Sequence, residues 1–218
     1  MSNTEKTKMY TLGEEIFSSV SHGIGVLLGV AATVALCVVA ALNSDTWGIV
    51  GSAVYGATLI ILYAMSTLYH SVTTPRAKRV FRVIDHCSIF LLIAGTYTPI
   101  MLCTMRTQAG AAWALSLLCV QWTTAIVGII LNAIDLHRFS KLSMVLYVML
   151  GWSALARWDV LWAMSLPAKS LLLGGGIVYM LGLIFYALKK RYAHAIWHLF
   201  VLGGSILHFF FILLYVVQ

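Results

Sequence analysis

The chain has 218 residues, of which 61% are hydrophobic and only 10% are charged. Soluble domains usually carry about 25% charged residues, so a water-soluble fold is excluded because its core cannot bury this much apolar surface. The net charge of +7 would suit a nucleic-acid partner, but the Lys and Arg residues lie in short loops between apolar runs, as membrane topology requires. We therefore expect an all-α, multi-pass membrane protein with no nucleic-acid partner.

The apolar runs predict one domain, residues 1–218, that crosses the bilayer as seven helices after a short cytoplasmic N-terminal segment, residues 1–12. Thr11 and Glu14 form a capping-box pattern, which predicts the start of the first helix. Thr74 and Pro75 fit the N-cap and first position of the third helix, and Pro99 predicts a kink near its end. The expected spans are residues 11–42, 47–71, 81–103, 111–134, 142–156, 170–188 and 194–217.

The distribution of Lys and Arg predicts the orientation of these spans. Three of the 14 cationic residues, Arg106, Arg157 and Lys169, fall on one side, and the other eleven fall on the side of the N-terminus. The positive-inside rule therefore predicts a cytoplasmic N-terminus and an extracytoplasmic C-terminus, in the inner (plasma) membrane. The eleven are Lys6, Lys8, Arg76, Lys78, Arg79, Arg82, Arg138, Lys141, Lys189, Lys190 and Arg191.

Two histidines, His194 and His198, stand four residues apart where the last apolar run begins. This spacing places both on one face of a helix, where two imidazoles can reach one metal ion. Histidine inside a bilayer is costly and usually functional. A single HxxxH motif is weak, and its spacing alone favours a simpler explanation, in which His194 is a wet interfacial residue and His198 makes a helix–helix hydrogen bond.

The predicted topology brings further polar residues to the same depth. His70 lies at the cytoplasmic end of the second span, Asp85 at the start of the third, and Glu15, Ser18 and His22 in the opening of the first. At a rise of ~1.5 Å per residue, each lies within a few turns of the inner interface. We expect Glu15, Ser18 and His22 to form a supporting network around a site rather than to bind metal themselves.

Three neutral imidazoles, from His70, His194 and His198, suit Zn²⁺ and leave a fourth position for water. Bound Zn²⁺ lowers the pKa of such a water to ~7, and a nearby carboxylate can orient or deprotonate it. Asp85 fits that role, and Ser66, one turn before His70, can hydrogen-bond the same water. Two alternatives stay open: Asp85 can pair with the arginine three residues before it, and Ser66 can bond the carbonyl four residues back.

The remaining histidines are expected outside this site. His86 points about 100° away from Asp85 on a helix, which favours an interfacial position. His208 lies about three turns from His198, too far to share a metal ion, and is expected to make a packing hydrogen bond. His137 is expected in a solvated loop.

Taken together, the patterns resemble the progestin and AdipoQ receptor family, and in particular its bacterial hemolysin III-like branch. The resemblance covers nearly the whole chain and depends on the order of individually weak motifs. One departure is Ser18, where many relatives have Asn, and it leaves the supporting network open. The motifs are Glu15-x-x-Ser18-x-x-Ser21-His22, Ser66-x-x-x-His70, Asp85 and His194-x-x-x-His198.

The resemblance implies a seven-helix bundle with a zinc ion near its cytoplasmic face. It implies His70, His194 and His198 as ligands, and Asp85 and Ser66 acting through water. Relatives are linked to hydrolysis of lipid amides such as ceramide and to hormone or lipid sensing. Bacterial members are linked to haemolysis and membrane-lipid homeostasis.

Three functions follow from these expectations. The leading one is a zinc-dependent hydrolase of a lipid amide or ester, with a membrane lipid bound from the inner leaflet. The second is a non-enzymatic sensor of lipid or membrane state in which zinc is structural. A pore-forming cytolysin or transporter is least favoured, because Pro99 and the glycine triplet at residues 174–176 do not form the paired helix breaks typical of transporters.

Overall fold

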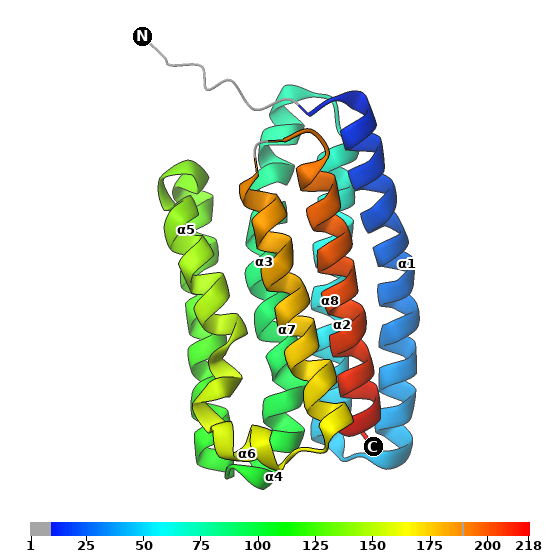
Figure 1. Ribbon diagram of the computed structural model, residues 1–218, viewed down its shortest axis with the longest axis vertical. Coiled ribbons are helices and arrows are strands. Elements are labelled where there is room, and N and C mark those ends of the chain that lie inside the picture. Colours follow the sequence, from blue (N-terminus) through cyan, green and yellow to red (C-terminus); the bar gives the residue numbers. More distant parts are fainter. Residues whose placement is uncertain (1–9, 189) are drawn as a thin grey trace.

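The computed structural model describes residues 10–188 and 190–218, and within that part the chain forms helices and no strand (Figure 1). The all-α prediction is therefore confirmed for the described residues. Most of the N-terminal segment expected over residues 1–12 lies outside them. The elements are α1 (Leu12–Asn43), α2 (Thr46–Ser71), α3 (Pro75–Pro99), η1 (Ile100–Met105), α4 (Arg106–Gln108), α5 (Ala111–Gly151), η2 (Ser153–Arg157), α6 (Trp158–Ala163), α7 (Leu166–Ala187) and α8 (Ala193–Tyr215).

Six helical segments of the described chain are long and apolar enough to cross a membrane. This finding supports a multi-pass membrane protein but differs from the expected seven spans. The difference arises because the expected spans 111–134 and 142–156 fall in one helical segment, Ala111–Ala163, of 53 residues.

α5 is broken at Asp135, whose φ of −157° and ψ of 95° are extended rather than helical. Its first arm, residues 111–134, and second arm, residues 136–151, fold back on each other. The Gln121 side-chain amide donates to the Leu150 carbonyl at 3.0 Å, although residues so far apart would be separated by ~43 Å on a straight helix. The Asp135 carboxylate caps the second arm by accepting from the Arg138 N–H at 2.9 Å. The second arm also contains His137, which was expected in a loop and is exposed.

The helices pack in a single bundle whose most buried member is α3. α1 packs on α2 and α8, α2 on α3, α3 on α5, and α7 on α8. In the most apolar stretch of Pro75–Gln108, 78% of the residues are buried, against 17% in Leu166–Ala187. A functional group carried by α3 is therefore shielded from the surrounding lipid.

The predicted helix starts agree with the structure. Thr11 caps α1 in a complete capping box with Glu14, and Thr74 precedes Pro75 at the first position of α3, although its hydroxyl makes no capping bond. At Pro99, where a kink was expected, α3 ends and the chain continues as the wider π-helical turn of η1. Proline has no N–H for the regular helical hydrogen bond, which favours such a change.

Gly51 of α2 lies directly against this turn. A Cβ at Gly51 would lie 2.7 Å from the Cα of Pro99, so even an alanine forces the two helices apart. We expect Gly51→Ala to lower the free energy of unfolding by about 1–3 kcal/mol, because overpacking against a backbone cannot be relieved by a rotamer change. Thermal unfolding of the detergent-solubilised protein measures this effect.

Gly174→Ala is the matched control on α7. Its Cβ would meet only the Leu207 side chain at 3.8 Å, an ordinary contact distance, so its melting temperature should match or exceed that of the wild type. Equal melting temperatures for the two variants would contradict the packing argument.

Candidate metal centre

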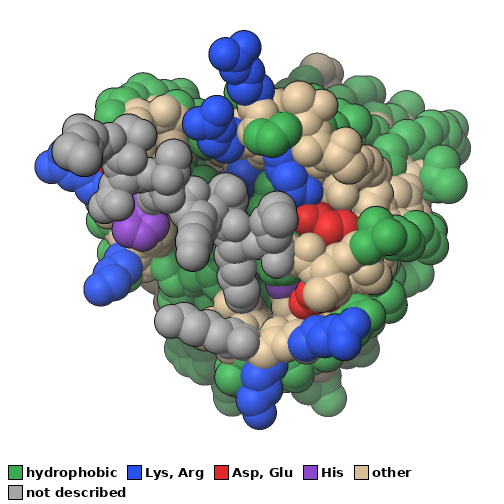
Figure 2. Space-filling view, turned by 90° about the horizontal axis from the view of Figure 1, so that it is seen from above, with side chains coloured by type: hydrophobic (Ala, Val, Ile, Leu, Met, Phe, Trp, Pro, Cys, Tyr) green, Lys and Arg blue, Asp and Glu red, His purple; other side chains and the backbone are tan. Residues whose placement is uncertain are grey.

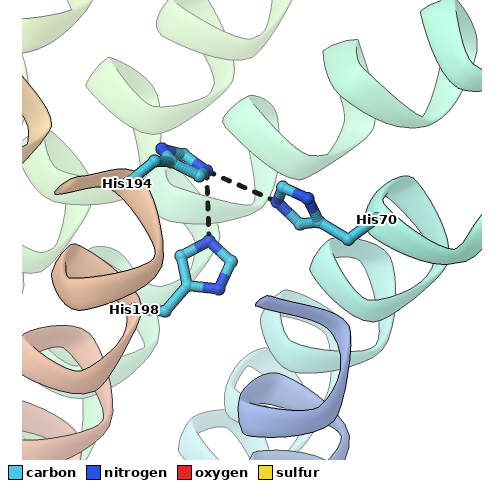
Figure 3. Close-up of side chains that lie close together, drawn as sticks. All are labelled: His70, His194 and His198. Atoms are coloured by element: carbon cyan, nitrogen blue, oxygen red, sulfur yellow. Dashed lines mark hydrogen bonds between the residues drawn. The ribbon is translucent and has the colours of Figure 1, made fainter. Parts of the chain in front are cut away.

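Three histidines from two helices meet at one end of the bundle (Figure 3). His70 comes from the last turn of α2, and His194 and His198 come from the first turns of α8. One ring nitrogen from each lies within 4.8 Å of the others. The His194 Nε2 atom is 3.4 Å from the His70 Nε2 atom and 3.2 Å from the His198 Nε2 atom.

The tautomers of two of these rings follow from their other hydrogen bonds. His70 Nδ1 lies 2.7 Å from the Glu15 carboxylate, and His198 Nδ1 lies 3.3 Å from the Ser18 carbonyl oxygen. Both oxygens accept, so each Nδ1 carries a proton and each neutral ring has a bare Nε2. Two lone pairs therefore face His194 Nε2, which can supply at most one proton, so a cation between the rings suits the arrangement better than hydrogen bonds do.

The spacing of the nitrogens also fits a metal ion. Ligand nitrogens bound to Zn²⁺ at ~2.0–2.1 Å in a tetrahedron are separated by ~3.3 Å. The two separations from His194 Nε2, 3.2 and 3.4 Å, match that value. Two of the three separations thus match tetrahedral geometry, and all three nitrogens lie close enough together for the imidazoles to hold one metal ion.

Glu15 positions His70 and neutralises a nearby cation. One carboxylate oxygen accepts from His70 Nδ1, and the other lies 2.8 Å from the Lys78 ammonium. A carboxylate behind a histidine fixes the orientation of the ring and raises its basicity as a ligand. The sequence predicted a supporting role for Glu15, and these contacts place its carboxylate beside His70.

Ser18 and His22 contact His198 from α1. Ser18 uses its backbone carbonyl rather than its side chain, so the replacement of an expected Asn by Ser leaves this contact unaffected. The ring of His22 stacks on that of His198, with centroids 3.8 Å apart and planes inclined by 14°. Both nitrogens of His22 are buried and make no hydrogen bond to the described residues.

Asp85 and Ser66 lie together in the interior, on α3 and α2. Both are buried, and the Ser66 hydroxyl interacts with the Asp85 carboxylate without reaching hydrogen-bond geometry. Within the described residues, no salt bridge joins Asp85 to Arg82, and Ser66 does not bond the carbonyl four residues back. Neither of the two structural alternatives is therefore present for this pair.

His86, for which an interfacial position was expected, is half-buried on α3. Its Nδ1 donates to the Arg82 carbonyl at 2.8 Å, and its carbonyl accepts from the Tyr147 hydroxyl at 2.8 Å. His86 lines the same cavity as Asp85, because the packing of α5 against α3 encloses both faces of this turn. An imidazole inside an apolar run was the signal that could have indicated this position.

Aromatic rings surround His194, and the sequence argument missed them. Tyr10 stacks on its ring, with centroids 4.8 Å apart and planes inclined by 20°, and Trp197 and Tyr186 lie 5.2 and 6.1 Å away. Burial raises the pKa of the Tyr10 hydroxyl well above its ordinary value, so this side chain remains a neutral phenol. These rings limit access of water to the cluster.

A large apolar cavity begins beside the histidine cluster and extends between α3, α7, α8 and the second arm of α5. The empty space bounded by its lining is about 1190 Å³ when the part open to the surroundings is included, and the volume that water-sized groups can occupy is about 140 Å³. Its lining includes His22, Asp85, His86, Ile93, Tyr147, Met180, Tyr186, Trp197 and His208.

The end of the bundle that carries the cluster is strongly basic. Figure 1 places the start of α3, the turn of α5 and the α7–α8 connection at this end. Figure 2 shows that face with Lys and Arg side chains spread around its edge and acidic side chains further in. Lys6, Lys8 and Lys189 of the charge count lie outside the described residues. The described cationic residues at this end are Arg76, Lys78, Arg79, Arg82, Arg138, Lys141, Lys190 and Arg191.

The fold and the site together define a class: a multi-pass α-helical membrane protein with a buried three-histidine cluster beside an apolar cavity. A family model described as "Haemolysin-III related" matches residues 10–209. The chain therefore belongs to the haemolysin-III related family, which confirms the resemblance to the bacterial branch of the progestin and AdipoQ receptor family.

Individual relatives agree with this assignment. The chain is 42% identical over 217 residues to "Hemolysin-3" of Bacillus cereus, covering 98% of this chain and 97% of the relative. It is 42% identical over 212 residues to "Hemolysin-3 homolog" of Bacillus subtilis (strain 168), covering 96% and 98%. A human relative, "Monocyte to macrophage differentiation factor", is 26% identical over 183 residues, covering 78% and 71%.

Glu14 ties the start of α1 to the chain just before His194. One carboxylate oxygen accepts from the Tyr192 N–H at 2.8 Å, and the other accepts from the N–H and hydroxyl of Thr11, both at 2.8 Å. Tyr192 has a left-handed φ of 60°, which is uncommon for a bulky residue. The Glu14 contact therefore stabilises the turn from which α8 begins.

We expect Glu14→Ala to lower the free energy of unfolding by about 1.5–3 kcal/mol, since it leaves three donors without their charged acceptor. Glu14→Gln keeps one acceptor oxygen and should lose less. Thermal unfolding of both variants beside the wild type measures the order of stability. A Glu14→Ala protein as stable as the wild type would show that this contact does not hold the turn.

Proposed function

We propose that this protein is a zinc-dependent hydrolase of a lipid amide or ester that acts in membrane-lipid homeostasis. The observation that supports this proposal best is the convergence of bare imidazole nitrogens from His70 and His198 on the nitrogen of His194. A buried carboxyl–hydroxyl pair, Asp85 and Ser66, lies on the neighbouring helices α3 and α2, and Asp85 lines the apolar cavity. This combination suits attack of water on a carbonyl group better than it suits a purely structural ion.

We further propose that the two arms of α5 cross the bilayer separately, which gives seven crossings in one domain over residues 1–218. The first arm has 24 residues, enough for a bilayer that needs about 20, and the second is extended by η2 and α6. The concentration of cationic side chains at the end with the cluster favours a cytoplasmic N-terminus in the plasma membrane, with the C-terminus outside. The site then lies near the inner leaflet.

The chain's own residues have distinct tasks in this proposal. His70, His194 and His198 would hold the ion, and Glu15 and the Ser18 carbonyl keep two of these rings in the tautomer that binds metal. When bound, Zn²⁺ polarises a carbonyl oxygen and makes water a better nucleophile near neutral pH.

Asp85 would act as the general base and then as the general acid. Its carboxylate accepts a proton from the attacking water and returns one to the departing amine or alcohol as the carbonyl–nitrogen or carbonyl–oxygen bond breaks. The Ser66 hydroxyl, next to Asp85, would orient the same water. The apolar cavity would hold the acyl chain, since its walls are mostly hydrophobic.

Metal content tests the ligand set directly. We expect the purified wild-type protein to contain about one zinc ion per chain and His194→Ala to lose it, because removing one of three imidazoles leaves too few ligands. Glu15→Gln should weaken zinc affinity by about 10–100-fold through the orientation of His70. Inductively coupled plasma mass spectrometry and competition with a chelator supply both measurements.

His137→Ala is the control, since His137 is exposed on the second arm of α5, and it should keep wild-type zinc. If the wild-type protein binds no zinc, or if His194→Ala binds it equally well, the proposed ligand set is wrong.

Turnover separates an enzyme from a sensor with a structural ion. We expect Asp85→Asn to keep its zinc and to lower kcat for lipid amide or ester hydrolysis by about 10²–10⁴-fold, since an amide cannot accept the proton. Mass spectrometry of released fatty acid from a panel of lipid amides and esters in liposomes measures the rate. The sensor is favoured instead if zinc raises the thermal stability of the wild-type protein and no product is released from any lipid in the panel.

A further inference from the structure

A further polar side chain, His208, lines the cavity far from the histidine cluster. This residue lies on α8 ten positions after His198, or ~15 Å along the helix axis. It lines the main cavity and also a smaller adjoining one. The packing hydrogen bond expected for it is present, since its Nε2 lies 3.1 Å from the Leu172 carbonyl oxygen.

That hydrogen bond determines which nitrogen of His208 is left without a proton and without a partner. A carbonyl oxygen only accepts, so Nε2 carries the proton and Nδ1 of the neutral ring is a bare acceptor. Nδ1 is buried and has no hydrogen-bond partner among the described residues. Most buried polar atoms are paired, so a partner for this atom is to be sought in the cavity that His208 lines.

The ring of His208 is held in place by α7. A Cβ on Gly175 would overlap the ring, so the glycine is what lets the imidazole reach the Leu172 carbonyl. Tyr179, on the same helix as Leu172, has its ring 5.5 Å from that of His208. Its hydroxyl is already hydrogen-bonded to the Ser205 hydroxyl at 2.8 Å. The protein around His208 therefore confines Nδ1 without supplying it a donor.

We propose that His208 Nδ1 anchors a second subsite in the cavity and accepts a hydrogen bond from a hydroxyl group on the acyl chain of the bound lipid. A hydroxyl satisfies an acceptor-only nitrogen, whereas an ether, a carbonyl or a plain methylene cannot. This inference rests on the proposed function, because that function places the amide or ester group of the lipid at the histidine cluster. The preferred lipid then carries its hydroxyl about 15 Å farther along the chain.

Two matched probes test the subsite: N-methyl ω-hydroxydodecanamide and its ω-methoxy analogue. The methoxy analogue lacks the hydrogen-bond donor and carries one additional methyl group at the far end, so the His208→Phe variant below is needed to separate the two differences. Isothermal titration calorimetry with the full-length, zinc-loaded protein in nanodiscs measures both dissociation constants. We expect the hydroxyl probe to bind the wild type about fivefold to tenfold more tightly, as for one net buried hydrogen bond.

In His208→Phe the two probes should bind within about twofold of each other, because phenylalanine fills the space but accepts no hydrogen bond. His137→Phe, at an exposed position outside the cavity, should keep the wild-type preference. The proposed subsite is overturned if both probes bind the wild type equally, or if His208→Phe keeps the wild-type preference for the hydroxyl probe. If His208→Phe fails to fold, equal binding of both probes to the wild type still overturns the proposed subsite.

Hydrolysis of the amide bond in both probes is measured in parallel, so that the hydrolase proposal and the subsite proposal can fail separately. A hydroxyl preference without release of methylamine supports the subsite and counts against the hydrolase. Release of methylamine at equal rates and affinities from both probes supports the hydrolase and overturns the subsite.

Discussion

Two hydrogen bonds at the edge of the cluster control its chemistry. Glu15 accepts from His70, and the Ser18 carbonyl accepts from His198, so the opposite nitrogens of both rings must point inward without protons. Electrostatic repulsion between these lone pairs is relieved best by a positive ion. The packing of the bundle makes these two hydrogen bonds possible. α1 contacts both α2 and α8, so its Glu15 carboxylate reaches His70 and its Ser18 carbonyl reaches His198.

The first turn of α1 performs two tasks through consecutive residues. Glu14 binds the Tyr192 N–H before α8, and Glu15 binds His70 at the end of α2. Neighbouring residues on a helix point about 100° apart, so one turn can hold two different partners. The helix start, the loop before α8 and the candidate ligands are thus stabilised together, and the site depends on the packing of helix ends rather than on one motif.

In the proposed function, the cavity and the cluster together define the class of substrate. Apolar walls alone fit any hydrophobic molecule, whereas polar atoms at both ends specify where the polar groups of a ligand must lie. Asp85 and His22 lie at one end, and His208 lies at the other. This arrangement suits the proposed substrate, an elongated amphiphile whose polar groups are separated by an apolar chain.

The sequence by itself determined the membrane class, the helix starts at Thr11 and Pro75, and the residues from which a metal site can be built. Composition, capping patterns and charge distribution are local properties, so they can be seen without a fold. Only the tertiary structure decided that α5 folds back at Asp135, that His86 lines the cavity, and which nitrogen of His208 is bare. Those features depend on contacts between residues far apart in the chain, which no local pattern encodes.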